Sequence, residues 1–285
     1  MLSKIEILAV LAFIIPAILH AFGFFLLITT QFEDENLTQR LYFILLSFSE
    51  LFVSGIAVVA GWSIKSQSYE YPVKMIRGFF GYTLMYEVMI ALTVDRFLKI
   101  FLNIKYPLYW TYSRTVKLCI ALLVLNGMMC LTFWLTKTSI DTLNTYYYLP
   151  FDIIFLIVAV VTYGYIFIKI VNNWKIRNSE LSMNSQSEEI QPQEAIRIHQ
   201  NKLLKQFMSN FLLVVTFLIF TVVPDLVYFC YGLNSYKDMK EWTKALMTIF
   251  YSISYICDFF IYTFSSITIR KKLLRWIRNI RRKTC

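Results

Sequence analysis

Apolar residues fall into seven stretches of about 20 residues or more, separated by shorter polar segments. About 20 apolar residues in a helix are needed to cross the ~30 Å hydrocarbon core of a bilayer. The pattern therefore predicts seven membrane-spanning helices. Their expected bounds are Ile5–Thr29, Leu41–Ile64, Val73–Ile100, Val116–Thr136, Tyr148–Val171, Phe207–Leu233 and Trp242–Phe264.

The segments outside these spans divide the chain further. Residues Asn172–Gln206 are rich in Ser, Glu, Gln and Asn, which predicts a flexible loop. Residues Ser266–Ile280 alternate apolar and basic side chains, which predicts an amphipathic helix lying on the membrane surface rather than an eighth span. We expect one seven-helix domain over residues 1–264 and an amphipathic helix with a basic tail over residues 265–285.

The composition agrees with this all-α membrane fold class. Hydrophobic residues make up 58% of the chain and charged residues only 16%, whereas soluble domains contain about 25% charged residues. So little polar surface could not cover so many Phe, Tyr, Leu and Ile side chains in water. A soluble domain and a disordered chain are both excluded.

The net charge of +10 indicates the orientation of the spans. If the N-terminus is outside, 20 of the 28 Lys and Arg residues lie in cytoplasmic segments and 8 lie outside. Lys and Arg in short loops resist translocation, so this division favours an N-out, C-in topology. The positive charge then lines the inner membrane surface and predicts contact with membrane lipids, not with nucleic acid.

The third span ends in the charged pair of Asp95-Arg96-Phe97. Ionisable residues are costly inside a bilayer and mark a functional site by default. The Asp and Arg can neutralise each other, or the Arg can become exposed when neighbouring helices separate. The alternative is an ordinary positive anchor at the inner end of a span.

Further motifs occupy matching places in other spans. The second span carries Glu50 within Leu46–Leu51, the fifth carries Tyr163, the sixth contains Thr221–Pro224 and the seventh contains Asp258–Tyr262. Together with Asp-Arg-Phe, this set resembles the rhodopsin-like (class A) G-protein-coupled receptors. The family motifs at these places are Leu-x-x-x-Asp, Asp-Arg-Tyr, Cys-Trp-x-Pro and Asn-Pro-x-x-Tyr, and the resemblance extends over nearly the whole chain.

The chain also departs from the family pattern. Val222 stands in place of the sixth-span Trp and Phe259 in place of the seventh-span Pro. Phe24 stands where the first span of the family has Asn, and the region around Leu204 lacks the acidic residue that often pairs with the motif Arg. The chain therefore resembles a divergent member.

The resemblance implies a plasma-membrane receptor that passes an extracellular ligand signal to a heterotrimeric G protein. The implied movement is an outward swing of the sixth helix about Pro224, with Arg96 leaving Asp95. We expect no enzyme activity, because the sequence carries no metal-ligand set and no hydrolytic triad. The residues expected to form the switch and the G-protein contact are Asp95, Arg96, Phe97, Tyr163, Pro224, Asp258 and Tyr262.

Aromatic and acidic residues in the outer half of the spans form the expected ligand pocket. Aromatic walls with one or two carboxylates would suit a cationic amine or a basic peptide terminus. Gly78 stands at the position of the family's amine-binding Asp, and Ser252 stands at that of the retinal-binding Lys, so neither a standard monoamine site nor retinal is expected. The pocket residues are Phe79, Tyr82, Thr83, Asp152, Asp225, Tyr228 and Phe229.

Two buried carboxylates in mid-bundle, Glu50 and Asp258, cannot both ionise cheaply. The resemblance implies a sodium ion between them; the alternative is a shared-proton hydrogen bond that joins the two helices. No other cofactor is expected. At the end of the chain, Cys285 follows a run of basic residues and is a candidate for palmitoylation.

The competing hypothesis is a membrane transporter or channel built on a seven-helix bundle. Such a protein would show interrupted helices at repeat-related positions or a polar ring along a pore. We find neither pattern in the sequence, so the receptor hypothesis comes first.

Overall fold

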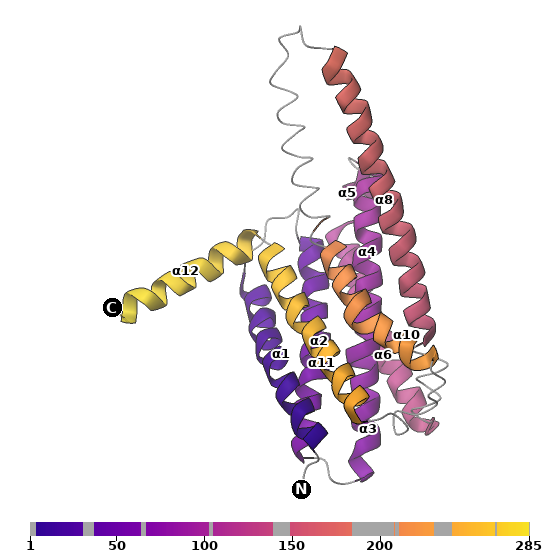
Figure 1. The fold of residues 1–285 in the computed structure, drawn as a ribbon, viewed down its shortest axis with the longest axis vertical. Helices are drawn as coiled ribbons and strands as arrows, with labels where there is room; N and C mark the ends of the chain where they lie inside the picture. The colour runs from indigo at the N-terminus through magenta and orange to yellow at the C-terminus, as the bar shows by residue number, and fades with distance from the viewer. Residues whose placement is uncertain are drawn as a thin grey trace.

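The computed structural model describes residues 4–30, 37–63, 67–102, 105–138, 149–183, 208, 211–230, 241–265 and 267–284. Within these residues the chain is almost entirely helical and contains no strand. The helices run side by side as an elongated bundle, and one helix projects sideways at one end (Figure 1).

The longest uninterrupted helices of the bundle are α1 (Lys4–Thr29), α2 (Leu37–Ser63), α6 (Tyr112–Leu135), α8 (Leu149–Met183) and α11 (Glu241–Ser265). Each contains a segment long and apolar enough to cross a membrane, so the protein has the helices of a membrane-embedded protein. These segments are Val10–Thr29, Leu37–Val59, Tyr112–Leu135, Leu149–Lys169 and Ala245–Thr263.

Residues 67–102 form a further helix with a π-helical segment inside it. It consists of α3 (Gln67–Arg77), η2 (Gly78–Thr83) and α4 (Leu84–Leu102). Gly81 of η2 lies so close to α2 that a Cβ at this position would overlap Val53. Glycine therefore allows the two backbones to approach each other here.

Residues 211–230 also combine α- and π-helix. A helical run over residues 211–217 leads into η5 (Leu218–Val222) and then α10 (Val223–Cys230). Pro224 is the second residue of α10, just after the end of η5. Proline lacks an N–H and collides with the carbonyl four residues earlier, and a π-helical turn is one way for a helix to accommodate it. The apolar part of the helix over residues 211–230, Phe211–Val227, is shorter than the five candidate spans.

Several boundaries differ from the prediction: α3 begins six residues earlier than expected and α6 four residues earlier. α8 continues to Met183, so the predicted loop beginning at Asn172 is wrong for its first twelve residues. α2 begins at Leu37, four residues earlier than expected. The predicted amphipathic helix is present as α12 (Ile267–Thr284), which leaves the bundle sideways in Figure 1.

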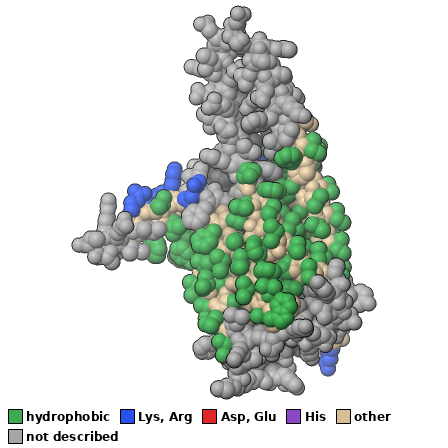
Figure 2. Space-filling view, viewed as in Figure 1, with side chains coloured by type: hydrophobic (Ala, Val, Ile, Leu, Met, Phe, Trp, Pro, Cys, Tyr) green, Lys and Arg blue, Asp and Glu red, His purple; other side chains and the backbone are tan. Residues whose placement is uncertain are grey.

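The outer surface of the bundle is apolar. Hydrophobic side chains cover most of the described face in Figure 2, and basic side chains gather on α12. On α6, large apolar residues such as Ile120, Met128 and Leu135 are more than half exposed. Apolar surface on this scale is unfavourable in water and matches a lipid environment.

At the end of the bundle where α12 begins, basic side chains of α2 and α12 form hydrogen bonds with the end of α1. Arg40 of α2 donates from Nε to the carbonyl of Leu27 at 2.9 Å and from Nη2 to that of Ile28 at 2.8 Å. Lys272 of α12 donates to the hydroxyl of Thr29 at 2.8 Å. These contacts satisfy carbonyl and hydroxyl groups in the last turn of α1.

Candidate functional site

Buried polar side chains gather in three places along the bundle. We call them the foot cluster, the middle cluster and the outer cluster. Each joins residues from several helices that are far apart in the sequence, and each contains at least one ionisable side chain that is almost fully buried. Such groups are costly to bury without a partner and are therefore candidates for function.

The foot cluster consists of Asp95, Arg96 and Tyr106. Asp95 is 1% exposed and Arg96 is 4% exposed, near the end of α4. Arg96 Nε lies 3.8 Å from Oδ2 of Asp95, while the Tyr106 hydroxyl donates to Oδ1 of Asp95 at 2.5 Å. Among the described residues, Arg96 Nε and Nη2 have no hydrogen-bond acceptor. The arginine is buried and under-satisfied, a state that a moving neighbour or a bound partner could relieve.

Tyr106 belongs to the short helix α5 (Tyr106–Tyr109), outside the candidate membrane spans. Burial, together with the negative charge of Asp95, raises the pKa of its hydroxyl above the ordinary value for tyrosine. The hydroxyl therefore remains a hydrogen-bond donor to Asp95 at physiological pH. This contact anchors the α5 segment to the foot of α4.

Phe97 and Tyr163 connect the end of α4 to α8. The ring of Phe97 stacks on Phe101 and meets the edge of Tyr165 of α8, with ring centroids 5.6 Å and 5.3 Å apart. Tyr163 of α8 is 6% exposed and lies within reach of the Arg96 charge. The predicted switch residues Asp95, Arg96 and Tyr163 are thus close together.

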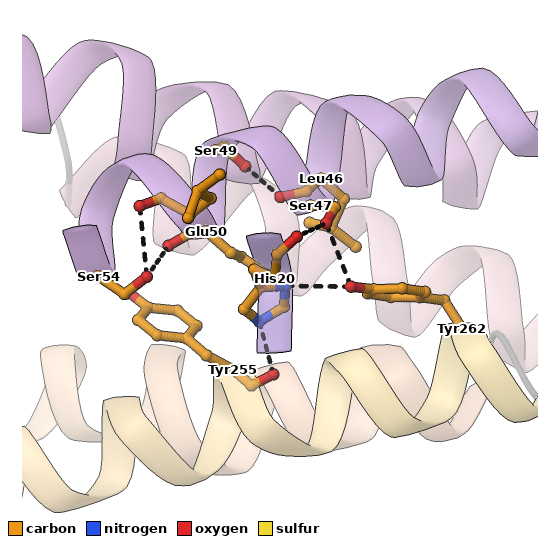
Figure 3. A network of polar contacts seen from close by, with 9 residues as sticks. His20, Leu46, Ser47, Ser49, Glu50, Ser54, Tyr255 and Tyr262 are labelled. Carbon is orange, nitrogen blue, oxygen red and sulfur yellow. Dashed lines mark hydrogen bonds and ion pairs between the residues drawn. The ribbon is translucent and has the colours of Figure 1, made fainter. Parts of the chain in front are cut away.

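The middle cluster consists of His20, Glu50, Asp258 and Tyr262. Figure 3 shows how His20 of α1, Glu50 of α2 and Tyr262 of α11 come together. The first three residues are fully buried, and so is Tyr262. His20 Nδ1 lies 2.9 Å from Oε2 of Glu50 and 3.1 Å from the Tyr262 hydroxyl. Asp258 is close enough to Glu50 and His20 for their charges to interact.

Ser47 closes the middle cluster. Its hydroxyl donates to the carbonyl of His20 at 3.1 Å and lies 3.2 Å from the hydroxyl of Tyr262. Tyr262, the predicted switch tyrosine, is therefore held by His20 and Ser47 in this structure. Among the described residues, its hydroxyl makes hydrogen-bond contacts with His20 and Ser47 and not with Arg96.

The middle cluster places a nitrogen beside Glu50 where a sodium ion would prefer an oxygen ligand. Hard cations are bound by several oxygens, whereas the partner beside Glu50 Oε2 is a ring nitrogen of His20. Among the described residues, no three His, Cys, Asp or Glu side chains are arranged to hold a metal. A protonated His20 would supply the positive charge that the resemblance assigns to a sodium ion beside Glu50 and Asp258.

The outer cluster brings four helices together. Asp225 of α10 accepts hydrogen bonds from the hydroxyl of Tyr86 of α4, at 3.3 Å, and from that of Tyr251 of α11. Asp152 of α8 is 1% exposed and lies close enough to Asp225 for their charges to interact. Oδ1 of Asp152 has no hydrogen-bond partner among the described residues. The carboxyl groups of Asp152 and Asp225 thus lie near each other, beside the tyrosines Tyr86 and Tyr251.

Tyr82 connects the outer cluster to the guanidinium group of Arg77. Its ring lies 6.3 Å from that of Tyr251, and its hydroxyl accepts a hydrogen bond from Arg77 Nη2 at 3.1 Å. The Arg77 guanidinium also lies 5.7 Å from the centre of the Phe13 ring. Tyr82, Asp152 and Asp225 of the predicted pocket are therefore near one another.

The structure does not place the remaining predicted pocket residues in the outer cluster. Phe79 is fully buried and stacks on Phe133, at 5.6 Å between centroids, in a separate apolar group. Thr83 is fully buried, and its hydroxyl has no partner among the described residues. The side chains of Tyr228 and Phe229, and the whole of Cys285, lie outside what the structure describes.

Sequence reasoning missed several members of these clusters. His20, Tyr86, Tyr106 and Tyr251 were not predicted, although a histidine within an apolar span is itself a signal of function. The tyrosines gave no such signal, because they are only some of the 19 in the chain. No protein-family model matches this sequence, and no curated protein matches it.

Proposed function

We propose that the protein is a seven-helix receptor, N-out and C-in, that passes an extracellular ligand signal to a heterotrimeric G protein at the plasma membrane. The five apolar helices would be joined in the bilayer by the helices over residues 67–102 and 211–230. The basic residues around Arg40, Lys169 and α12 would face the cytoplasm, where the inner leaflet is anionic.

The observation that carries this proposal is the state of Arg96. An arginine that is 4% exposed, with two nitrogens lacking acceptors among the described residues, is costly in an apolar bundle. The nearest acidic group, Asp95, is already bonded to Tyr106. A movement that opened the inner end would release Arg96 to a G protein or to nearby tyrosines, and the cost of burying it would favour that movement.

Two features could connect the outer end to this movement. Pro224 and the π-helical segment η5 interrupt the regular hydrogen bonding of the helix that also carries Asp225. Tyr262 is held in the middle cluster by His20 and Ser47. A ligand that pulled on Asp225 would therefore act on the interrupted helix, whose inner half is expected to swing outward.

The outer cluster supports a ligand that carries a positive charge. Asp152 and Asp225 would repel each other if both were ionised in a dry site, and an ammonium or guanidinium group between them would remove the repulsion. Tyr82, Tyr86 and Tyr251 supply hydroxyls and aromatic faces, which suit such cations. This supports a cationic amine or a basic peptide as the ligand class.

Energy transfer between the labelled receptor and a panel of labelled Gα subunits tests the proposal, first without ligand and then with a set of amines and basic peptides. Arg96→Ala should reduce recruitment at least tenfold at equal surface expression, since it removes the central G-protein contact. Lys117→Ala is the matched control, because Lys117 is an exposed cation on α6 near the same end. Asp225→Asn should weaken the response to any cationic agonist found in the same set.

Two results would contradict the receptor proposal. One is recruitment of no Gα subunit in any condition. The other is recruitment that is the same for Arg96→Ala and the wild type. If the amine set instead produced uptake or ionic current that did not depend on Arg96, the protein would be a transporter or a channel.

A further inference from the structure

The position of His20 raises the question of which cation neutralises the middle cluster. Its ring is fully buried between α2 and α11, with Nδ1 2.9 Å from Glu50 Oε2 and Nε2 2.8 Å from the carbonyl oxygen of Tyr255 (Figure 3). A carbonyl oxygen only accepts hydrogen bonds, so Nε2 must carry a hydrogen. The ring orientation is thereby determined, and Nδ1 is directed at the carboxyl of Glu50.

A proton must lie between His20 and Glu50. If Nδ1 kept its lone pair and Glu50 were ionised, two electron-rich atoms would face each other at 2.9 Å without water to screen them. A proton on either atom turns this contact into a hydrogen bond. The pair is then either an imidazolium with a carboxylate or a neutral imidazole with a carboxylic acid, and it is neutral in both forms.

The same reasoning applies to Asp258. Its carboxyl is fully buried, neither of its oxygens has a hydrogen-bond donor among the described residues, and it lies close enough to Glu50 for their charges to interact. Two carboxyl groups that interact in a dry interior are stable together only when one of them carries a proton. A second proton between Glu50 and Asp258 makes the whole cluster neutral.

We infer that His20 takes the place of a bound cation in this protein: the chain neutralises Glu50 and Asp258 with protons held among its own side chains and does not bind sodium there. The cluster then joins α1 to α2 and α11 in the same way at any sodium concentration. This inference concerns the stability of the bundle and does not require the protein to be a receptor.

The test is the thermal unfolding of the purified full-length chain, followed by exposure of its buried cysteines to a thiol-reactive dye. Cys119 and Cys130 are free and buried, so they report on loss of the fold. Unfolding is compared in NaCl and in choline chloride at equal ionic strength, about 0.15 M. The wild-type Tm should be the same in both salts.

Variants test the role of His20 separately. His20→Asn should lower the Tm by roughly 5 °C or more, because it leaves buried carboxylates without their partner. Glu50→Gln added to His20→Asn should lower the Tm by less than the sum of the two single changes, since the pair is already broken. The matched control is His199→Asn, which removes the only other histidine in the chain and should leave the Tm unchanged.

Two outcomes would overturn the inference. A wild-type Tm that rises with NaCl, saturates, and loses this rise in Glu50→Gln would identify a sodium site. Full additivity of His20→Asn and Glu50→Gln would mean that the two residues do not form a pair. If His20→Asn fails to fold, the wild-type salt comparison still decides between sodium and no sodium, and neither result depends on G-protein signalling.

Discussion

At the scale of single residues, the contact between α1 and α11 depends on Gly23. A Cβ on Gly23 would overlap the hydroxyl of Tyr262 and stand 3.1 Å from the ring of Phe259. We predict that Gly23→Ala destabilises the bundle by about 1–3 kcal/mol, the usual cost of inserting a methyl group into a packed site. Thermal unfolding measures this as a lower Tm.

Gly55 provides the matched comparison. Apart from the adjacent backbone of α2 itself, no atom lies within 4 Å of a Cβ built on this residue. Gly55→Ala should therefore leave the Tm unchanged or raise it, because alanine favours a helix over glycine by up to about 1 kcal/mol. Equal effects of the two changes would mean that Tyr262 moves aside freely and that Gly23 is not a packing requirement.

The properties of single residues explain which members of the candidate site could be predicted from the sequence. Asp95, Arg96, Glu50 and Asp258 were found from the sequence because charged residues are rare within apolar spans, and each is buried in the structure. The role of Tyr106 could not be found in this way. It comes from the fold of the short segment after α4, which turns the hydroxyl back to Asp95.

At the scale of helices, the π-helical segments limit what periodicity can predict. The predicted faces assume about 100° per residue along each helix. A π-helical turn spaces its hydrogen bonds five residues apart and changes that angle. Within η2, Phe79 packs with Phe133 of α6, whereas Tyr82 lies near Tyr251 of α11, although both were predicted to line one pocket.

Pro224 provides a prediction at this scale. Pro224→Ala restores a backbone N–H and removes the clash with the preceding turn, so the helix around η5 should straighten and swing less. We predict G-protein recruitment reduced about tenfold, with the Tm unchanged or higher. The energy-transfer assay and thermal unfolding measure the two quantities on the same variant.

Pro16 provides the control for this change. It is a proline within α1, far along the chain from η5. Pro16→Ala also removes a proline from an apolar helix but should preserve recruitment. If Pro224→Ala signals as well as the wild type, the helix does not use this interruption, and the proposed swing must have another origin.

At the scale of the whole molecule, the arrangement of apolar and basic surfaces agrees with the patterns in the sequence. The predicted span bounds match the described helices within a few residues except at the end of α8 and, by six residues, at the start of α3. Helix length and apolarity depend on local sequence, which is why they could be predicted. The burial of His20 against Glu50 and the pairing of Asp152 with Asp225 depend on contacts between distant segments, which local patterns do not contain.

The orientation in the membrane is the last prediction, and it follows from the whole charge distribution. Arg40, Lys169 and α12 lie at the end of the bundle opposite the start of α1. Because basic residues favour the cytoplasmic side by about 1 kcal/mol each near an anionic leaflet, we predict an extracellular N-terminus. An N-terminal epitope should be labelled on intact cells, and a C-terminal epitope only after permeabilisation.

The chain carries an internal check on this orientation. Asn36-Leu37-Thr38 is a glycosylation sequon in the segment between the first two spans. With the N-terminus outside, this segment faces the cytoplasm and Asn36 carries no glycan, so glycosidase treatment should not change the mobility of the protein. Labelling of the C-terminal epitope on intact cells would reverse the topology. The foot cluster would then face outward, where no G protein could reach Arg96, and the receptor proposal would fail with it.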